Sequence, residues 1–171
     1  MARKIFRATD GFDSVDLLKY SRDHLRAAEL LFGSHYLHYD SAAHLVHLSL
    51  ELLLKAALLY RDGEFEAEHR LARLLAELKR GNASLVVSAV GERTLLMLEE
   101  YEGSRYPNPL NPVDVGNEDL PDIRNLWEEL LSHLPEPLLS SFRPADQFTK
   151  GARVLMVKTH DSETRESQEP D

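Results

Sequence analysis

Apolar residues return every three to four positions in five segments of the chain, which is the period of an amphipathic α-helix. The segments cover about residues 14–33, 41–61, 68–80, 84–102 and 120–134. Asp13 or Ser14 can cap the first, and Gly33 can end it. The second is apolar on most of its faces, so we expect it to be the central and most buried helix. The pattern therefore predicts an all-α protein.

The connections predict how these helices are arranged. Short links join the second, third and fourth segments, which favours an antiparallel up-and-down bundle of four or five helices. Three prolines exclude a helix from residues 103–116, GSRYPNPLNPVDVG, so we expect a long Pro-rich loop there. Gly91, inside the fourth segment, costs about 1 kcal/mol relative to Ala and indicates close packing or a kink.

The C-terminal part differs in character from the rest. Pro135 and Pro137 end the fifth segment, and a short turn is expected over residues 138–142. Val154–Val157 is a strand candidate without a partner in sequence, so residues 146–160 are expected to form an extended arm. Residues 161–171 are polar and acidic, which predicts a disordered tail. The predicted bundle thus spans residues 1–145.

A polar stripe runs along the second segment, HLVHLSLELLLKAALL. His44, His47, Glu51 and Lys55 are three, four and four residues apart, which places them on one face of a helix. Such a stripe fits a metal site, a catalytic site or a structural ion pair. For a metal, His44, His47 and Glu51 are the candidate ligands, but the Glu-x-x-His pairs of helical dimetal sites are missing.

The ion pair is the better-supported interpretation of the stripe. Glu51 and Lys55 stand at i and i+4 with the acid first, the favourable order. If the helix is buried, both charges need further partners to offset desolvation. The candidate seam of polar residues consists of Glu51, Lys55, His69, Tyr101, Arg105 and Tyr106.

Three pieces in this order resemble the HEPN domain (higher eukaryotes and prokaryotes nucleotide-binding). The pieces are HLSLELLLKAALL with Glu51 and Lys55, HRLARLLAEL with His69, and YEGSRYP with Arg105. The entry HYDSAAHLVHLSLE is also similar, and the resemblance spans residues 13–107. It implies an up-and-down helical bundle that dimerises and works near nucleotide or RNA chemistry.

The resemblance also implies a catalytic motif that this chain lacks. Many HEPN members are metal-independent ribonuclease toxins beside a nucleotidyltransferase partner, and they use an Arg, four to six residues, then a His. Here only Arg153 and His160 have that spacing, and they lie in the predicted arm. We therefore favour a non-catalytic nucleotide- or nucleic-acid-linked binding or accessory module, without a cofactor. A divergent ribonuclease using His69, Arg105 and His47 is the first alternative, and a metal-binding bundle is the second.

Charge and composition narrow the class further. The net charge is −9, and the last eleven residues contribute −4 of it, so a broad nucleic-acid surface is disfavoured while a narrow site is not. The chain has no Cys, which excludes disulfides and thiolate chemistry and fits a cytoplasmic protein. Charges interrupt the longest apolar run, so no membrane span is expected.

Three further features have plain structural interpretations. Arg105 and Tyr106 are expected to seal the end of the bundle, with Arg105 paired to an acid such as Glu51. Trp127 has the spacing of a core or dimer-seam residue. Glu99, with Glu100 and Glu102, is expected to form a solvated helix end.

Overall fold

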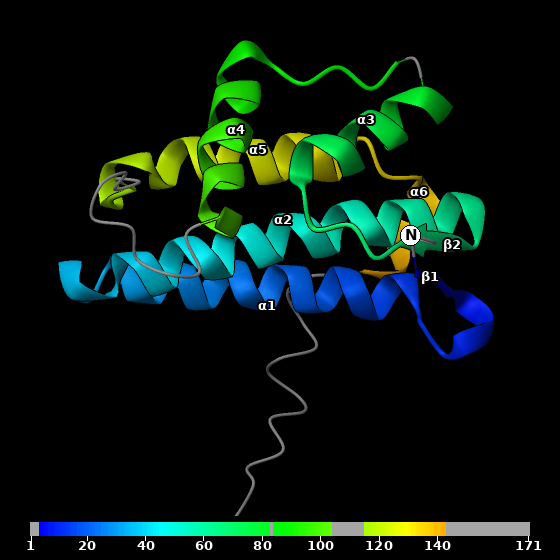
Figure 1. Ribbon diagram of the computed structural model, residues 1–171, viewed down its shortest axis with the longest axis horizontal. Coiled ribbons are helices and arrows are strands. Elements are labelled where there is room, and N and C mark those ends of the chain that lie inside the picture. Colours follow the sequence, from blue (N-terminus) through cyan, green and yellow to red (C-terminus); the bar gives the residue numbers. More distant parts are fainter. Residues whose placement is uncertain (1–3, 83, 104–114, 143–171) are drawn as a thin grey trace, which may run out of the picture.

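The computed structural model describes residues 4–82, 84–103 and 115–142, and for residues 100–103 it describes the backbone alone. Two short strands and six α-helices follow one another along the chain, with short 3₁₀ turns between some of them (Figure 1). The strands and helices are β1 (Ile5–Arg7), α1 (Ser14–Phe32), α2 (Tyr39–Asp62), β2 (Glu64–Glu66), α3 (Leu71–Gly81), α4 (Ala89–Gly103), α5 (Leu120–Ser132) and α6 (Glu136–Ser141). The predicted all-α class is confirmed.

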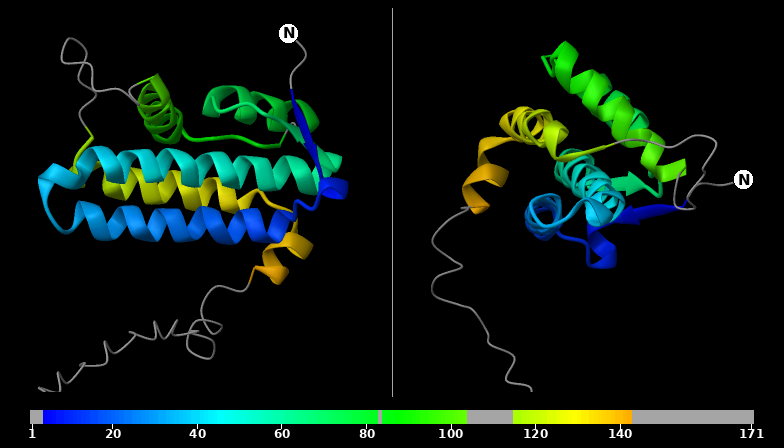
Figure 2. Two further views of the ribbon diagram at one scale, coloured as in Figure 1. Left: turned by 60° about the horizontal axis from the view of Figure 1, so that its bottom comes forward. Right: turned by 90° about the vertical axis from the view of Figure 1, so that its left-hand side faces the viewer.

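Helix α2 lies at the centre of the bundle. It runs antiparallel to α1 after a tight turn, and α5 lies alongside in the same direction as α2, whereas α3 and α4 cross on another side (Figure 2). Contacts join α2 to α1, α3, α4 and α5. Leu50, Leu53, Leu54 and Leu58 of α2 are each at most 1% exposed. The prediction of a central second helix is thus confirmed, and burial of this face is the main stabilising contribution.

By length and composition, α2 with the turn before it could also cross a membrane, since a window within residues Tyr36–Asp62 has a mean hydropathy of 1.5 despite its charged residues. However, 78% of its most apolar window is buried against the rest of the fold. Burial of that kind is what a core helix of a helical bundle needs.

The first helix begins where the sequence predicts. The carboxylate of Asp13 accepts hydrogen bonds from the backbone N–H groups of Val15 and Asp16, at 2.7 and 3.1 Å. This is N-capping, which satisfies donors that the helix itself leaves without partners.

Buried hydroxyl groups join α1, α2 and α5. The Ser21 hydroxyl donates to the carbonyl of Ser49 at 2.7 Å, and the Ser49 hydroxyl donates to the carbonyl of Ser21 at 2.7 Å. The indole N–H of Trp127 then donates to the Ser21 hydroxyl at 3.0 Å. Trp127 is therefore a core residue whose one polar atom is satisfied, as burial of an indole requires.

Helix α4 begins at Ala89, five residues later than the sequence predicts. The reason is Glu129 of α5, whose carboxylate accepts from the backbone N–H and the hydroxyl of Ser88 at 2.6 and 3.0 Å. A Cβ at Gly91 would lie 2.7 Å from Glu129 Oε2 and 2.8 Å from Val87. Gly91 therefore allows α4 to approach α5 closely, one of the two roles expected for it.

A small antiparallel sheet was absent from the sequence prediction. Ile5, Phe6 and Arg7 pair with Glu66, Phe65 and Glu64, in a stretch expected to be a linker. Phe6 and Phe65 lie 5.5 Å apart between ring centroids, and Phe12 packs on both. Strands of three residues are too short to show a period, so the aromatic contacts hold this sheet together.

The short turn expected over residues 138–142 is largely the helix α6, residues Glu136–Ser141. The Pro-rich segment 104–114, the predicted arm and the predicted tail lie outside the described residues.

Candidate functional site

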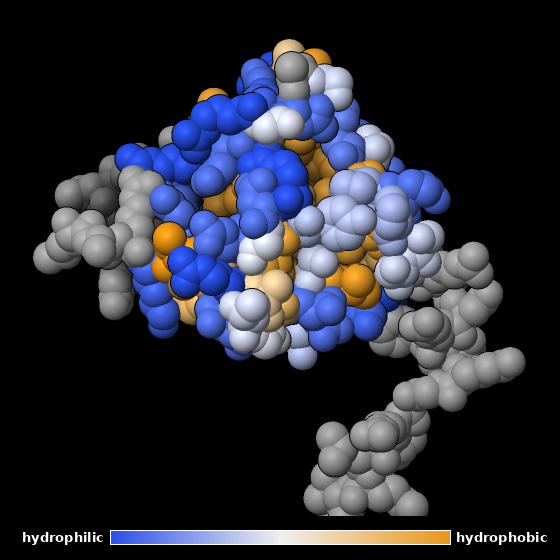
Figure 3. All heavy atoms as spheres, turned by 90° about the vertical axis from the view of Figure 1, so that its right-hand side faces the viewer, coloured by the Kyte–Doolittle hydropathy of each residue, from blue (hydrophilic) through white to orange (hydrophobic). Residues whose placement is uncertain are grey.

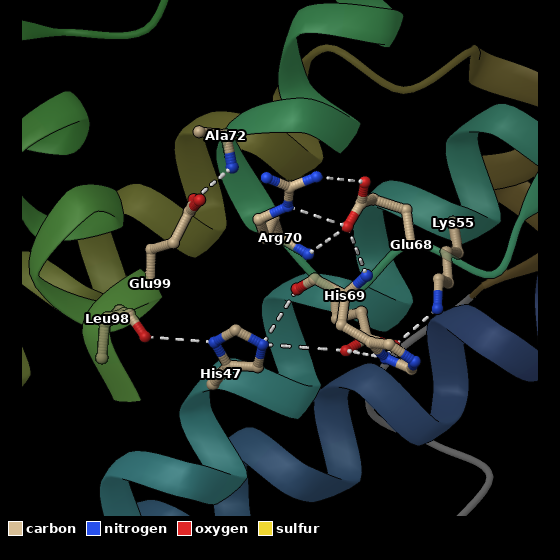
Figure 4. A network of polar contacts seen from close by, with 9 residues as sticks. His47, Lys55, Glu68, His69, Arg70, Ala72, Leu98 and Glu99 are labelled. Carbon is tan, nitrogen blue, oxygen red and sulfur yellow. Dashed lines mark hydrogen bonds and ion pairs between the residues drawn. The ribbon is translucent and has the colours of Figure 1, made fainter. Parts of the chain in front are cut away.

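Four residues of α2 and of the segment before α3 meet in what we call the Glu51 cluster: His47, Glu51, Lys55 and His69 (Figure 4). The Lys55 ammonium donates to Glu51 Oε1 at 2.6 Å. Both residues are 5% exposed. The predicted Glu51–Lys55 pair is therefore present and lies in the interior, where its charges cost desolvation energy unless other groups share them.

His47 faces backbone acceptors on both sides of its ring. Nδ1 lies 3.1 Å from the carbonyl oxygen of Leu98, and Nε2 lies 3.1 Å from the carbonyl oxygen of His69. A carbonyl oxygen only accepts, so each ring nitrogen must carry a proton to make both bonds. The ring can make both bonds at once only as an imidazolium, and Glu51 Oε2, 3.7 Å from Nε2, is placed to balance that charge.

His69 is the member of the cluster that reaches solvent. Its Nδ1 lies 3.2 Å from each oxygen of Glu51, and its side chain is 48% exposed. The carboxylate accepts from Nδ1 and so fixes the orientation of the ring. An oriented imidazole with an accessible edge can bind an anion or exchange a proton.

The cluster keeps Glu51 ionised. Burial alone would raise the pKa of its carboxyl, but hydrogen bonds from His47 and Lys55, together with the positive charges of Lys55 and His69, outweigh burial and lower this pKa to about 2. At neutral pH the buried carboxylate is therefore a permanent charge.

A second carboxylate stands next to the cluster. Glu68 accepts from the backbone N–H groups of His69 and Arg70 at 3.1 and 3.2 Å, and from the guanidinium groups of Arg70 and Arg73 at 3.2 Å. Hydrogen bonding from Arg70, ahead of the cost of burial, lowers the pKa of Glu68 to about 2. These bonds hold residues 68–70 outside the helix, so α3 begins at Leu71 rather than at Glu68.

Helix α4 also contributes a carboxylate. Glu99 Oε2 accepts from the backbone N–H of Ala72 at 2.6 Å, so it caps the N-terminus of α3. Glu99 is half-buried, and the expected solvated helix end is wrong for this residue. Leu98 and Glu99 are neighbours on α4. Because Leu98 binds His47 and Glu99 binds Ala72, these two residues connect α4 to α2 and to α3.

Positive groups are concentrated around His69. Among the described residues, three cations (Lys55, Arg70 and Arg73) balance three carboxylates (Glu51, Glu68 and Glu99), and the rings of His47 and His69 add positive charge when protonated. In a chain of net charge −9, this is a local departure from the acidic average. It favours an anionic ligand at the exposed edge of His69.

The predicted seam is brought together as far as the structure describes it. Glu51, Lys55 and His69 are in contact. Arg105 and Tyr106 lie outside the described residues, as does the side chain of Tyr101, so their membership of the seam stays a prediction.

The alternative of a metal site finds no support in the part of the chain that the structure describes. No group of three or more His, Cys, Asp or Glu side chains there is arranged to hold a metal ion. Both ring nitrogens of His47 are directed at carbonyl oxygens, which removes it as a ligand of a set with His44 and Glu51.

Sequence reasoning missed Glu68, Arg70, Arg73 and Glu99. A signal for Glu68 was present, since an acid shortly before a helical segment often binds the free N–H groups of its first turn. Glu99 offered no such signal, because its partner is a backbone group of a different helix.

The fold and the cluster define an all-α bundle whose buried polar seam opens to solvent at one histidine. A family model, described as the HEPN domain, matches residues 14–136. The chain therefore belongs to the HEPN domain family. No curated protein and no solved structure matches it significantly.

Proposed function

We propose that this HEPN-domain protein is a non-catalytic module that binds the phosphate groups of a nucleotide or an RNA at the exposed edge of His69. The observation that supports this most is the position of Lys55, Arg70 and Arg73 beside the oriented and half-exposed ring of His69. Phosphate is the anion that such a site, next to the Arg70 and Arg73 guanidinium groups, suits best.

The arrangement of the other groups favours binding over catalysis. Lys55 is committed to Glu51, and His47 is committed to two carbonyl oxygens. Neither is placed to exchange a proton with a substrate, since both are at least 95% buried. His69 alone combines a fixed ring with access to solvent.

A titration of the protein with ATP and with single-stranded RNA tests the proposal, by calorimetry and by fluorescence anisotropy. His69→Ala should weaken binding about tenfold or more, the effect of losing one hydrogen bond to a charged group. His38→Ala, at an exposed histidine outside the cluster, is the matched control and should bind as the unchanged protein does. Absence of binding to either ligand at low salt would contradict the proposal.

The resemblance to HEPN proteins supports two further parts of the same proposal. The protein would act in the cytoplasm as a homodimer, beside a nucleotidyltransferase-type partner. Light scattering at several protein concentrations tests the dimer. Copurification with the product of an adjacent gene tests the partner. A monomer that copurifies with no such product would contradict both parts, and phosphate binding at His69 would be the remaining proposal.

A divergent metal-independent ribonuclease is the second candidate, and the contact between Glu51 and His69 favours it. A carboxylate that orients an imidazole is the arrangement by which a histidine acts as a general base. The test is cleavage of structured and single-stranded RNA in the presence of a chelator. If RNA is cleaved by the unchanged protein and not by the His69→Ala variant, this candidate replaces the binding module.

A further inference from the structure

A partly open cavity of about 80 Å³ lies between α2, α3 and α5, away from the Glu51 cluster. Its walls are mostly aliphatic. They include Leu53, Leu54 and Ala57 of α2, Leu78 of α3, Leu130 of α5, and Leu134 just after α5. Figure 3 faces the end of the molecule where α2 finishes, and shows hydrophobic side chains at the bottom of hollows between hydrophilic ones.

The size of this cavity is meaningful. A cavity needs about 10–15 Å³ to hold one water molecule, and an apolar cavity of about 150 Å³ in another protein takes up benzene. The cavity here, about 80 Å³, is roughly half as large as the benzene site, and because it is partly open a bound ring would keep one edge at its mouth. Water inside it would face leucine and alanine side chains over most of its surface, so an apolar guest gains by replacing it.

Three polar residues complete the lining: Arg61, Asn82 and His133. Arg61 uses its guanidinium on Asp62 and on the carbonyl oxygens of Glu77 and Leu78. It therefore closes the C-terminal end of α3 with four of its five N–H donors in use, and Asp62 balances its charge.

Asn82 and His133 each keep one group without a hydrogen-bond partner among the described residues. Asn82 Oδ1 accepts from the backbone N–H and the hydroxyl of Ser84, at 3.1 and 2.6 Å, which leaves its NH₂ group. His133 Nε2 donates to the carbonyl of Val86 at 3.0 Å, which leaves Nδ1 as an acceptor in the neutral ring. One donor and one acceptor on an aliphatic lining suit a neutral hydroxyl.

We infer that this cavity is a binding site for a small neutral molecule with an apolar body, of the size of one aromatic ring, and a single hydroxyl group. The aliphatic walls take the body. The Asn82 NH₂ group donates a hydrogen bond to the hydroxyl oxygen of the ligand. His133 Nδ1 accepts a hydrogen bond from the ligand O–H group. The site is independent of the phosphate-binding function proposed above.

The experiment uses the full chain and two probes, phenol and benzene, each at millimolar concentration. Binding is monitored by NMR of the leucine methyl groups. Phenol should shift the methyl resonances of the leucines around the cavity, and should bind roughly thirtyfold more tightly than benzene, the effect of two hydrogen bonds. Ala57→Leu fills the cavity and should abolish these shifts. Ala89→Leu adds the same side chain at an exposed position on α4 and should leave them unchanged.

Asn82→Asp tests the polar end of the site, because it keeps the oxygen that binds Ser84 and removes the NH₂ donor. The preference for phenol over benzene should then fall about fivefold, because the hydroxyl oxygen loses its donor while the O–H keeps its acceptor. No methyl shift with either probe overturns the inference, and so do shifts that persist in Ala57→Leu or vanish in Ala89→Leu. Equal binding of both probes to the unchanged protein overturns the assignment of the hydroxyl.

Discussion

Lys55 lies one helical turn beyond Glu51 on α2 and donates to its carboxylate at 2.6 Å, with both side chains 7% exposed. The same spacing on a helix surface is worth only about 0.3–0.5 kcal/mol. In the interior, each charge depends on the other, because water is not available to replace a missing partner.

We therefore expect Lys55→Met to lower the free energy of unfolding by about 3–5 kcal/mol, the usual result of breaking a buried pair from one side. Urea denaturation measures it. Lys19→Met is the matched control, since Lys19 pairs with Asp16 on the surface at 3.2 Å. It should cost less than about 1 kcal/mol. Equal losses in the two variants would contradict the structural role given to the buried pair.

The stability should fall at acidic pH because of Glu51. Its pKa is about 2 in the folded protein against an ordinary 4.5, so between these values the unfolded chain binds a proton that the folded one does not. The contribution of ionised Glu51 to the free energy of unfolding is complete above pH 4.5 and is lost as the pH falls toward 2. This contribution amounts to about 3 kcal/mol. Glu51→Gln should be less stable at neutral pH and should show a flatter dependence over the acidic range than the unchanged protein. An unchanged slope would assign the dependence to other acids, such as Glu68.

Substitutions of Arg61 and Gly81 should have coupled effects on the free energy of unfolding. A Cβ at Gly81 would collide with the Arg61 guanidinium, which binds the last carbonyl groups of α3. Gly81→Ala should therefore displace this cap and cost about 1 kcal/mol, the value of one hydrogen bond. In an Arg61→Ala background the same change should be neutral or stabilising, because Ala is the better helix former. A double-mutant cycle by urea denaturation measures the coupling, and additive effects would contradict it.

Gly91→Ala should loosen the packing of α4 on α5. The added methyl would lie 2.8 Å from Val87 and 3.2 Å from Leu126, closer than ordinary contact. Overpacking of this kind costs about 1–3 kcal/mol, more than the gain in helix propensity. Thermal denaturation should show a lowered Tm. A raised Tm would mean that α4 moves aside without loss.

The helices could be predicted because their signals are local. Asp13 as a cap, the apolar face of α2 and the stop at Gly33 are each predicted from a few neighbouring residues. The start of α4 could not be read in this way, since it depends on Glu129 from another helix. The paired strands were missed because Phe6 and Phe65 are far apart in sequence and meet only in the fold.

In the site, too, only the contacts with a local sequence signal could be predicted. The pairing of Glu51 with Lys55 follows from the i, i+4 spacing. His69 was placed in the seam because its segment resembles the corresponding segment of HEPN domains. The role of His47 could not be inferred, because both of its acceptors are backbone carbonyl groups, at Leu98 and His69. Side-chain patterns do not reveal such partners.

Trp127 is the only tryptophan of the chain, and its indole bonds to Ser21 in the interface of α5 with α1. The protein therefore contains a single indole reporter, placed between α5 and α1. Its emission should follow the separation of α5 from α1. Detachment of α3 from α2 should leave the emission unchanged, so a folding experiment read by fluorescence alone would count a molecule with an open Glu51 cluster as native.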